Sequence, residues 1–197
     1  MKKYFVPFFL FALISCNNNP GKITVKSDDG KSTATVDVSS AEKSTEQMQN
    51  KAEELKKLSP LSVDQLKTLL PEELAGIKRS TYNASTAMGI AVGEAEYRKD
   101  DTSVIKLAVY DCAGETGAAY YSATYWMKMN MQSESDDGYT KTVDFMNGKA
   151  VESYEKSSNK YTLVYFGNDR VLISLEGENI SLDDLKDAAK SLNVKVS

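Results

Sequence analysis

Residues 139–178 read YTKTVDFMNGKAVESYEKSSNKYTLVYFGNDRVLISLEGE, and this stretch decides the predicted fold. Runs of Val, Ile, Thr and aromatic residues are separated by turn residues, which predicts four strands, over 139–146, 149–155, 161–166 and 171–176. The pair Asn147-Gly148 favours a two-residue hairpin turn between the first two strands. Because all the connections are short, we expect these strands to form an antiparallel meander.

Three further strands are predicted upstream, over 77–82, 88–98 and 103–112. The last of them is apolar on both of its sides, as in a central strand that is covered on both faces. Strands come in groups rather than alternating singly with helices. This predicts an α+β fold, an antiparallel sheet of about six to seven strands with helices packed on it. The order of elements loosely resembles that of the PsbP-like and Mog1-like sandwich.

Three amphipathic helices are expected beside the sheet, over 41–58, 63–70 and 182–192. The apolar stripe of the first helix is formed by Met48, Ala52 and Leu55. Ser62 opens the second helix with a capping box, and Ser181 caps the third. The acidic, Ser-rich stretch 133–138 is expected to be a loop.

A fourth helix is predicted over 116–131, and its composition is unusual. Apolar residues fall on every side of it and Lys128 is its single charge, which is typical of a helix covered on more than one side. We expect the sheet to cover one side and the helix over 42–58 the other. The alternative is that one side faces a groove, a partner or a bound apolar ligand. The candidate residues for that role are Tyr120, Tyr121, Tyr125 and Trp126.

The amino terminus has the features of an export signal. Met1-Lys2-Lys3 is positively charged, and residues 4–14 form an uncharged, mostly apolar run that is too short to span a bilayer as a helix. The run ends in Leu13-Ile14-Ser15-Cys16, which resembles the lipobox of bacterial lipoproteins. This resemblance implies cleavage before Cys16, a diacylglycerol on its sulfur and usually a third acyl chain on its amine. The chain then divides into a signal peptide 1–15, a tether or small hairpin 16–40, an amphipathic helix 41–60 and a single α+β domain 61–197.

The lipobox also predicts a location, the bacterial cell envelope, where the acyl chains hold the protein to the membrane. Asn17, which follows the cysteine, resembles the sorting residue of outer-membrane lipoproteins in Gram-negative bacteria, whose domains face the periplasm.

Residues 23–38 allow two interpretations. One is a hairpin that turns at Asp29-Gly30, and the other is a disordered tether rich in Ser, Thr and Lys.

Charge and cysteine content argue against nucleic-acid binding and against a disulfide. After Lys2 and Lys3 leave with the signal, 22 basic residues face 28 acidic ones, and the net charge moves from −4 to −6. An acidic chain is a poor binder of nucleic acid. The two cysteines are Cys16 and Cys112. With Cys16 lipidated, Cys112 has no intrachain partner, so we expect a free thiol and no disulfide.

The chain contains no histidine. This excludes Ser-His-Asp and Cys-His nucleophile pairs and His-based zinc sites. The remaining candidates are Cys112 before a helix start, the carboxylates within 134–137, and Glu94 with Glu96 on one strand face. Burial or solvation explains each of them, so we assign no catalytic residue, metal ligand or cofactor. The expected function is a non-catalytic module that binds an envelope partner or ligand. The alternative is a histidine-free hydrolase that depends on carboxylates or a metal ion.

Overall fold

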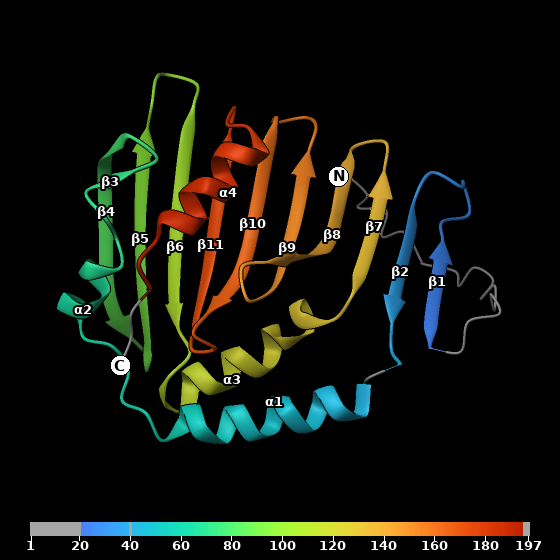
Figure 1. The fold of residues 1–197 in the computed structure, drawn as a ribbon, viewed down its shortest axis with the longest axis horizontal. Helices are drawn as coiled ribbons and strands as arrows, with labels where there is room; N and C mark the ends of the chain where they lie inside the picture. Colours follow the sequence, from blue (N-terminus) through green and yellow to red (C-terminus); the bar gives the residue numbers. More distant parts are fainter. Residues whose placement is uncertain (1–20, 40, 195–197) are drawn as a thin grey trace, which may run out of the picture.

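The computed structural model describes residues 21–39 and 41–194 (Figure 1). Within them, one antiparallel sheet of 11 strands carries the fold, in the order β1-β2-β7-β8-β9-β10-β11-β6-β5-β4-β3. The strands are β1 (Lys22–Lys26), β2 (Thr33–Asp37), β3 (Glu73–Leu74), β4 (Ile77–Ala87), β5 (Ile90–Arg98), β6 (Val104–Asp111), β7 (Met131–Ser135), β8 (Gly138–Phe145), β9 (Gly148–Glu155), β10 (Lys160–Gly167) and β11 (Val171–Glu178). The helices are α1 (Ala41–Lys56), α2 (Val63–Thr68), α3 (Gly114–Thr124), the 3-10 helix η1 (Tyr125–Lys128) and α4 (Leu182–Ser191).

The expected sheet of about six to seven strands is wrong. The seven strands predicted from the sequence correspond to β4–β6 and β8–β11, and the meander over β8–β11 forms as expected. Four more strands join them in the described part of the chain, namely β1, β2, β3 and β7. β3 and β7 lack an alternating apolar pattern and are strands through their pairing with β4 and with β2 and β8. β1 and β2 form the hairpin that was one of the two interpretations of 23–38.

Strand β7 is the main correction to the sequence prediction. The stretch expected to be an acidic loop, 133–138, instead comprises the end of β7, a two-residue turn at 136–137 and the first residue of β8. On its other side β7 pairs with β2, from Val36 opposite Met131 to Thr33 opposite Glu134. Of the two interpretations of 23–38, the structure therefore has the hairpin, with β1 paired to β2 and Gly30 in its turn at φ +71°.

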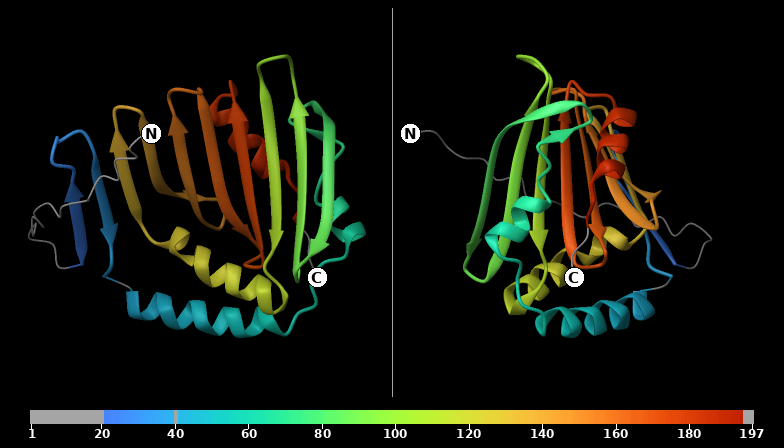
Figure 2. Two further views of the ribbon diagram at one scale, coloured as in Figure 1. Left: turned by 180° about the vertical axis from the view of Figure 1, so that it is seen from behind. Right: turned by 60° about the vertical axis from the view of Figure 1, so that its left-hand side comes forward.

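Helices cover the two faces of the sheet unequally. On one face, α2 and α4 pack on β5, β6, β10 and β11 around a core that includes Leu66, Leu107, Ile173 and Leu185. On the opposite face, α3 and η1 cover only the end of the strands where β6 ends and β11 begins, around Cys112 and Leu172. The right-hand view of Figure 2 shows the sheet closer to edge-on, with α4 on one side of it. We call the second face, beyond α3 and η1, the open face.

The prediction that the aromatic helix is sandwiched is confirmed. Ala52 and Leu55 of α1 are buried in one cluster with Ala118 and Tyr121 of α3, and α1 lies along α3 at the end of the strands (Figure 1). The predicted range 116–131 is too long, because α3 ends at Thr124 and η1 at Lys128. The Thr124 hydroxyl donates to the carbonyl of Tyr120, 2.8 Å away, and such a bond competes with the regular helical pattern.

A buried ion pair ties the linker between α1 and α2 to the sheet. Arg170, in the turn between β10 and β11, places Nε 2.8 Å and Nη2 3.1 Å from the two carboxylate oxygens of Asp111 at the end of β6. Its Nη2 also donates to the carbonyl of Ser59 at 3.0 Å. The backbone N–H of Leu61 donates to Asp111 Oδ2 at 2.7 Å. The linker is therefore bonded to both members of the ion pair, to Arg170 through the Ser59 carbonyl and to Asp111 through the Leu61 N–H. These bonds fix the position of α1 against α3.

Candidate functional site

A row of hydroxyl side chains crosses the open face of the sheet. The register pairs Ser133 of β7 with Thr140 of β8. Thr140 is paired in turn with Ser153 of β9, and Ser153 with Thr162 of β10. Because neighbouring strands lie about 4.8 Å apart, the four hydroxyl groups follow one another at a regular spacing. All four residues are half-buried, and each hydroxyl can donate and accept a hydrogen bond.

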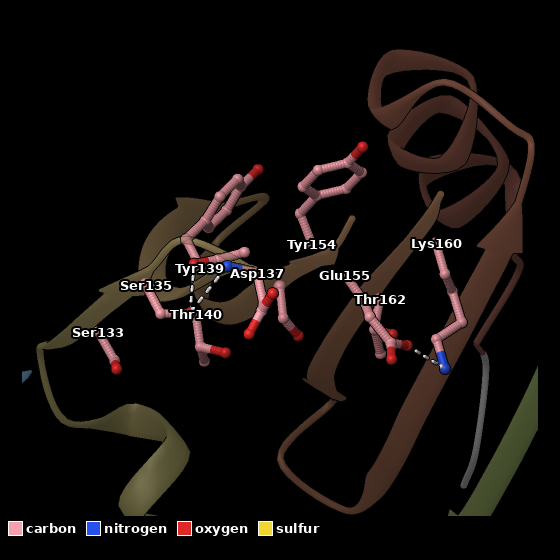
Figure 3. Close-up of a pocket in the computed structure, with 11 residues that line it drawn as sticks. Ser133, Ser135, Asp137, Tyr139, Thr140, Tyr154, Glu155, Lys160 and Thr162 are labelled. Carbon is pink, nitrogen blue, oxygen red and sulfur yellow. Dashed lines mark hydrogen bonds and ion pairs between the residues drawn. The ribbon is translucent and has the colours of Figure 1, made fainter. Parts of the chain in front are cut away.

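This row lies in a groove of about 370 Å³ (Figure 3). The ion pair between Lys160 Nζ and Glu155 Oε2, 3.2 Å apart, lines the same groove near the turn that joins β9 and β10. The rings of Tyr139 and Tyr154 point away from Thr140 in Figure 3, because successive residues of a strand face opposite sides. The groove is therefore polar, with hydroxyl groups along its floor.

A second groove, of about 390 Å³, continues the first across the sheet. Thr162, in the first groove, is paired with Glu176 of β11, and Glu176 lines the second. From Glu176 the same row passes through Lys106 of β6 and Glu96 of β5 to Thr81 of β4. One row of polar side chains thus spans the open face from β7 to β4.

The second groove is acidic and has the ring of Tyr110 in it. Glu94, Glu96 and Glu176 line it together with Lys106, which lies between Glu96 and Glu176. Glu96 Oε1 is 2.5 Å from Arg98 Nη2, so one of the three carboxylates is already paired. Burial, with the nearby charges of Glu94 and Glu176, raises the pKa of the Tyr110 hydroxyl. Tyr110 therefore stays protonated at neutral pH and can donate a hydrogen bond.

The four aromatic residues predicted to contact a partner do not share one surface. Tyr121 is 1% and Tyr125 9% exposed, and both belong to the cluster under α1. Tyr120 is half-buried, and its ring lies 5.4 Å from that of Tyr110. Trp126 is 47% exposed. Of the four candidates, Trp126 has the side chain that is exposed enough to contact a partner. Tyr120 lies beside the open face, because its ring packs against that of Tyr110 on that face.

Of the two cysteines, the structure describes Cys112 and not Cys16. Cys16 lies outside the described residues, so its lipidation stays a prediction. Cys112 is a fully buried free thiol. Burial raises its pKa to about 12, so the reactive thiolate is absent at neutral pH. This geometry opposes a nucleophilic role for Cys112 at the start of α3.

A buried carboxylate lies on the face covered by α4. Glu152 is 1% exposed, and it accepts a hydrogen bond from the Tyr139 hydroxyl at 2.8 Å. Lys186 Nζ of α4 lies 2.7 Å from its Oε2, and Lys141 Nζ 3.1 Å from its Oε1. Burial alone would raise the pKa of Glu152, but the bonds from Lys186, Tyr139 and Lys141 outweigh it and hold the pKa below its usual value. Glu152 therefore stabilises the packing of α4 as an anion.

A third groove, of about 730 Å³, lies between the β8–β9 turn, the β10–β11 turn and residues 192–194. Phe145, Tyr165 and Phe166 contribute apolar surface to it. Residues 195–197 come directly after its wall and lie outside the described part of the chain.

Residues 21–39 and 41–194 contain neither a candidate metal cluster nor a helix suited to span a membrane. No group of three or more Asp, Glu or Cys side chains is arranged there to hold a metal ion. Glu134, Asp136 and Asp137, a weak candidate from the sequence, lie at the end of β7 and in the turn after it. No helix in the same residues has the length and apolar character that crossing a membrane requires.

The open face is the surface that the sequence interpretation missed. Its signal was present in part, since Ser133 and Ser135, and Thr140 and Thr142, occupy alternate positions of adjacent segments. Such alternation places the hydroxyl groups of one strand on one face. The alignment of these groups between strands depends on register, which the sequence alone does not specify.

Comparison with known proteins identifies no relative. No protein-family model, no curated protein and no solved structure matches the chain. The loose resemblance to the PsbP-like and Mog1-like sandwich therefore has no support beyond the order of elements. The class of protein is therefore defined by its geometry alone. It is an open antiparallel sheet, one face of which is polar, grooved and only partly covered by helices.

Proposed function

We propose that this chain is a lipid-anchored protein of the bacterial cell envelope whose domain binds a polar partner or ligand on its open face without catalysing a reaction. The observation that carries the proposal is the row of polar side chains that crosses the open face from β7 to β4 through two adjoining grooves. The lipobox at Leu13–Cys16 supports the anchor, and the acyl chains would keep the open face within reach of other envelope components.

A polar sheet face can also simply face water, as in many antiparallel sheets. Two features favour binding here. The hydroxyl groups of Ser133, Thr140, Ser153 and Thr162 are aligned, so an extended ligand can meet donors and acceptors in series. The grooves are concave, and a concave surface buries more of a ligand than a flat one does.

The hydrolase alternative is favoured by one observation, the presence of Glu94, Glu96 and Glu176 in a single groove. General acid–base catalysis would need one carboxylate held protonated beside one that is ionised. Glu96 is instead paired with Arg98, and Lys106 lies between Glu96 and Glu176 in the cross-strand row. This arrangement suits recognition of a charged or hydroxylated ligand better than proton transfer.

Anchoring is tested by labelling cells with a palmitate analogue. The wild-type chain should be labelled and recovered with membranes, whereas Cys16→Ser should be unlabelled and keep its signal peptide. A labelled Cys16→Ser chain would contradict the lipobox assignment.

Binding is tested by photo-crosslinking in whole cells. A photoreactive residue is placed at Ser153 on the open face, with a matched control at exposed Lys190 on α4. We expect a discrete adduct from position 153 alone, and we expect its loss when Thr162→Lys and Thr140→Lys fill the groove. Equal adducts from both positions, or adducts that persist in the groove variants, would refute binding at this face. For the hydrolase alternative, Glu94→Gln should abolish turnover of any candidate substrate.

A further inference from the structure

The sheet ends in two edges that differ in chemistry. In the described residues it ends at β1 on one side, and on the other at β4, whose first residues are paired with β3. The outer side of an edge strand presents unpaired N–H and C=O groups that can accept another strand. Natural proteins protect such edges with short strands, lysines, prolines or bulges.

The β1 edge is protected in this way. Its sequence is KITVK, with Lys22 and Lys26 at the two ends of a five-residue strand. A strand added outside β1 would have to accommodate both lysines. This edge is therefore a poor site for pairing.

The β4 edge is protected only where β3 covers it. β3 pairs with Ile77 and Lys78, and a bulge follows between Arg79 and Thr81. The remaining segment, Ser80–Ala87, reads STYNASTA and has neither a charge nor a proline. From Thr81 to Ala87 its pairing with β5 is regular. In the described structure Tyr82 is 50% exposed, and the hydrogen bonds of Thr81–Ala87 are confined to the sheet ladder and the turn that follows.

We propose that Ser80–Ala87 pairs antiparallel with the same segment of a second copy of this chain, so that two sheets join edge to edge. A strand that pairs antiparallel with itself is related to its copy by a two-fold axis, which gives a closed dimer. Because the segment is uncharged, no like charges meet across the new pairing. The segment also has no charged residues whose pattern would favour pairing with a different protein over pairing with a second copy of itself.

The position of the flanking charges fits this arrangement. Lys78 and Arg79 precede the segment, whereas its other end is Ala87-Met88-Gly89. In an antiparallel pair, Arg79 of one copy approaches the uncharged end of the other, so the basic residues of the two copies stay apart. Because the protected β1 edge stops further addition, the assembly closes at two copies rather than growing into a fibre.

The dimer would also enlarge the candidate binding surface. A two-fold axis perpendicular to the joined sheet brings the same face of both copies to the same side. Thr81 and Asn83 line the second groove next to the new junction. The two acidic grooves would then adjoin, and the polar row would continue from one copy into the other.

Cysteine scanning of the full-length, membrane-bound chain tests the pairing. Paired Cα atoms in an antiparallel ladder lie about 4.5–5.5 Å apart, within disulfide range. Thr81→Cys, Asn83→Cys and Ser85→Cys are oxidised separately, with Val25→Cys on the protected edge as the exposed control. The parent chain controls for Cys16 and for buried Cys112.

We expect a covalent dimer that is strongest at one of the three β4 positions and weaker at its neighbours. This peak marks the two-fold axis. No dimer at any β4 position, equal dimer at all positions and at Val25→Cys, or a disulfide to a protein of different mass would each overturn the proposal.

A charge variant provides a second measurement. Asn83→Lys places two lysines near each other across the axis, and Thr24→Lys is the matched change on β1. Light scattering of the detergent-solubilised full chain should report a dimer for the parent and for Thr24→Lys, and at least a tenfold weaker dimer for Asn83→Lys. Circular dichroism checks that each variant is folded. A monomeric parent, or a dimer unaffected by Asn83→Lys, would refute pairing through β4.

Discussion

Replacing Arg170 by alanine should break the contact that holds the α1–α2 linker to the sheet. Arg170 is 7% exposed and Asp111 is 0% exposed, so the variant leaves a buried carboxylate without its counter-charge. Removing one partner of a buried ion pair destabilises proteins by about 3–5 kcal/mol. Two backbone donors remain on Asp111, from Leu61 at 2.7 Å and Ala113 at 3.3 Å. We therefore expect the lower end of that range, about 3 kcal/mol.

The free energy of unfolding is measured by urea titration of the detergent-solubilised chain, followed by circular dichroism. For a domain of this size, about 3 kcal/mol corresponds to a fall in melting temperature of about 6–12 °C. The matched control is Lys149→Ala, which removes an exposed ion pair with Asp144 of 2.6 Å. Exposed pairs contribute up to about 1 kcal/mol.

A double variant separates charge from packing. In the Arg170→Ala background, Asp111→Asn removes the unpaired charge and should recover part of the lost stability. If Arg170→Ala and Lys149→Ala destabilise the protein equally, the buried pair does not fix the linker and the reasoning is wrong.

Three further predictions concern the core. Leu55→Ala should destabilise the protein by about 2–5 kcal/mol, because Leu55 is fully buried between α1 and α3. Urea titration measures this loss, and the control Gln47→Ala, on the exposed side of α1, should leave the urea midpoint nearly unchanged. Cys112 should react with a thiol reagent slowly in the native protein and quickly after denaturation, since burial raises its pKa to about 12; rapid native labelling would contradict this. Glu152→Gln should lower stability at pH 7, and the difference from the wild type should shrink as the pH falls through the lowered pKa of Glu152. A Glu152→Gln variant as stable as the wild type at pH 7 would show that ionised Glu152 does not stabilise the fold.

Local signals in the sequence were sufficient for most of the helices and for the meander. The capping box is present, with Ser62 N donating to Gln65 Oε1 at 2.9 Å and Gln65 N to Ser62 Oγ at 3.3 Å. The Asn147-Gly148 signal correctly placed the β8–β9 hairpin. The turn is displaced by one residue, however, because Phe145 pairs with Gly148 and Met146 takes the positive φ of +51°. Caps and turns act over three or four residues, so the sequence carries them directly.

The sequence by itself carried the amphipathic stripe of α1, the caps and the signals for seven strands, because each is a pattern of neighbours in the chain, as is the lipobox, which stays a prediction. Only the tertiary structure decided that Met131–Ser135 is a strand, since its pairing partners lie in β2 and β8. It also decided which aromatic residues are buried, with Tyr121 beneath α1 and Trp126 outside. The open face arises in the same way, because its hydroxyl groups align only when the register brings Ser133, Thr140, Ser153 and Thr162 opposite one another. Register is set by hydrogen bonds between separate strands, and a shift of one residue would turn these hydroxyl groups to the other face.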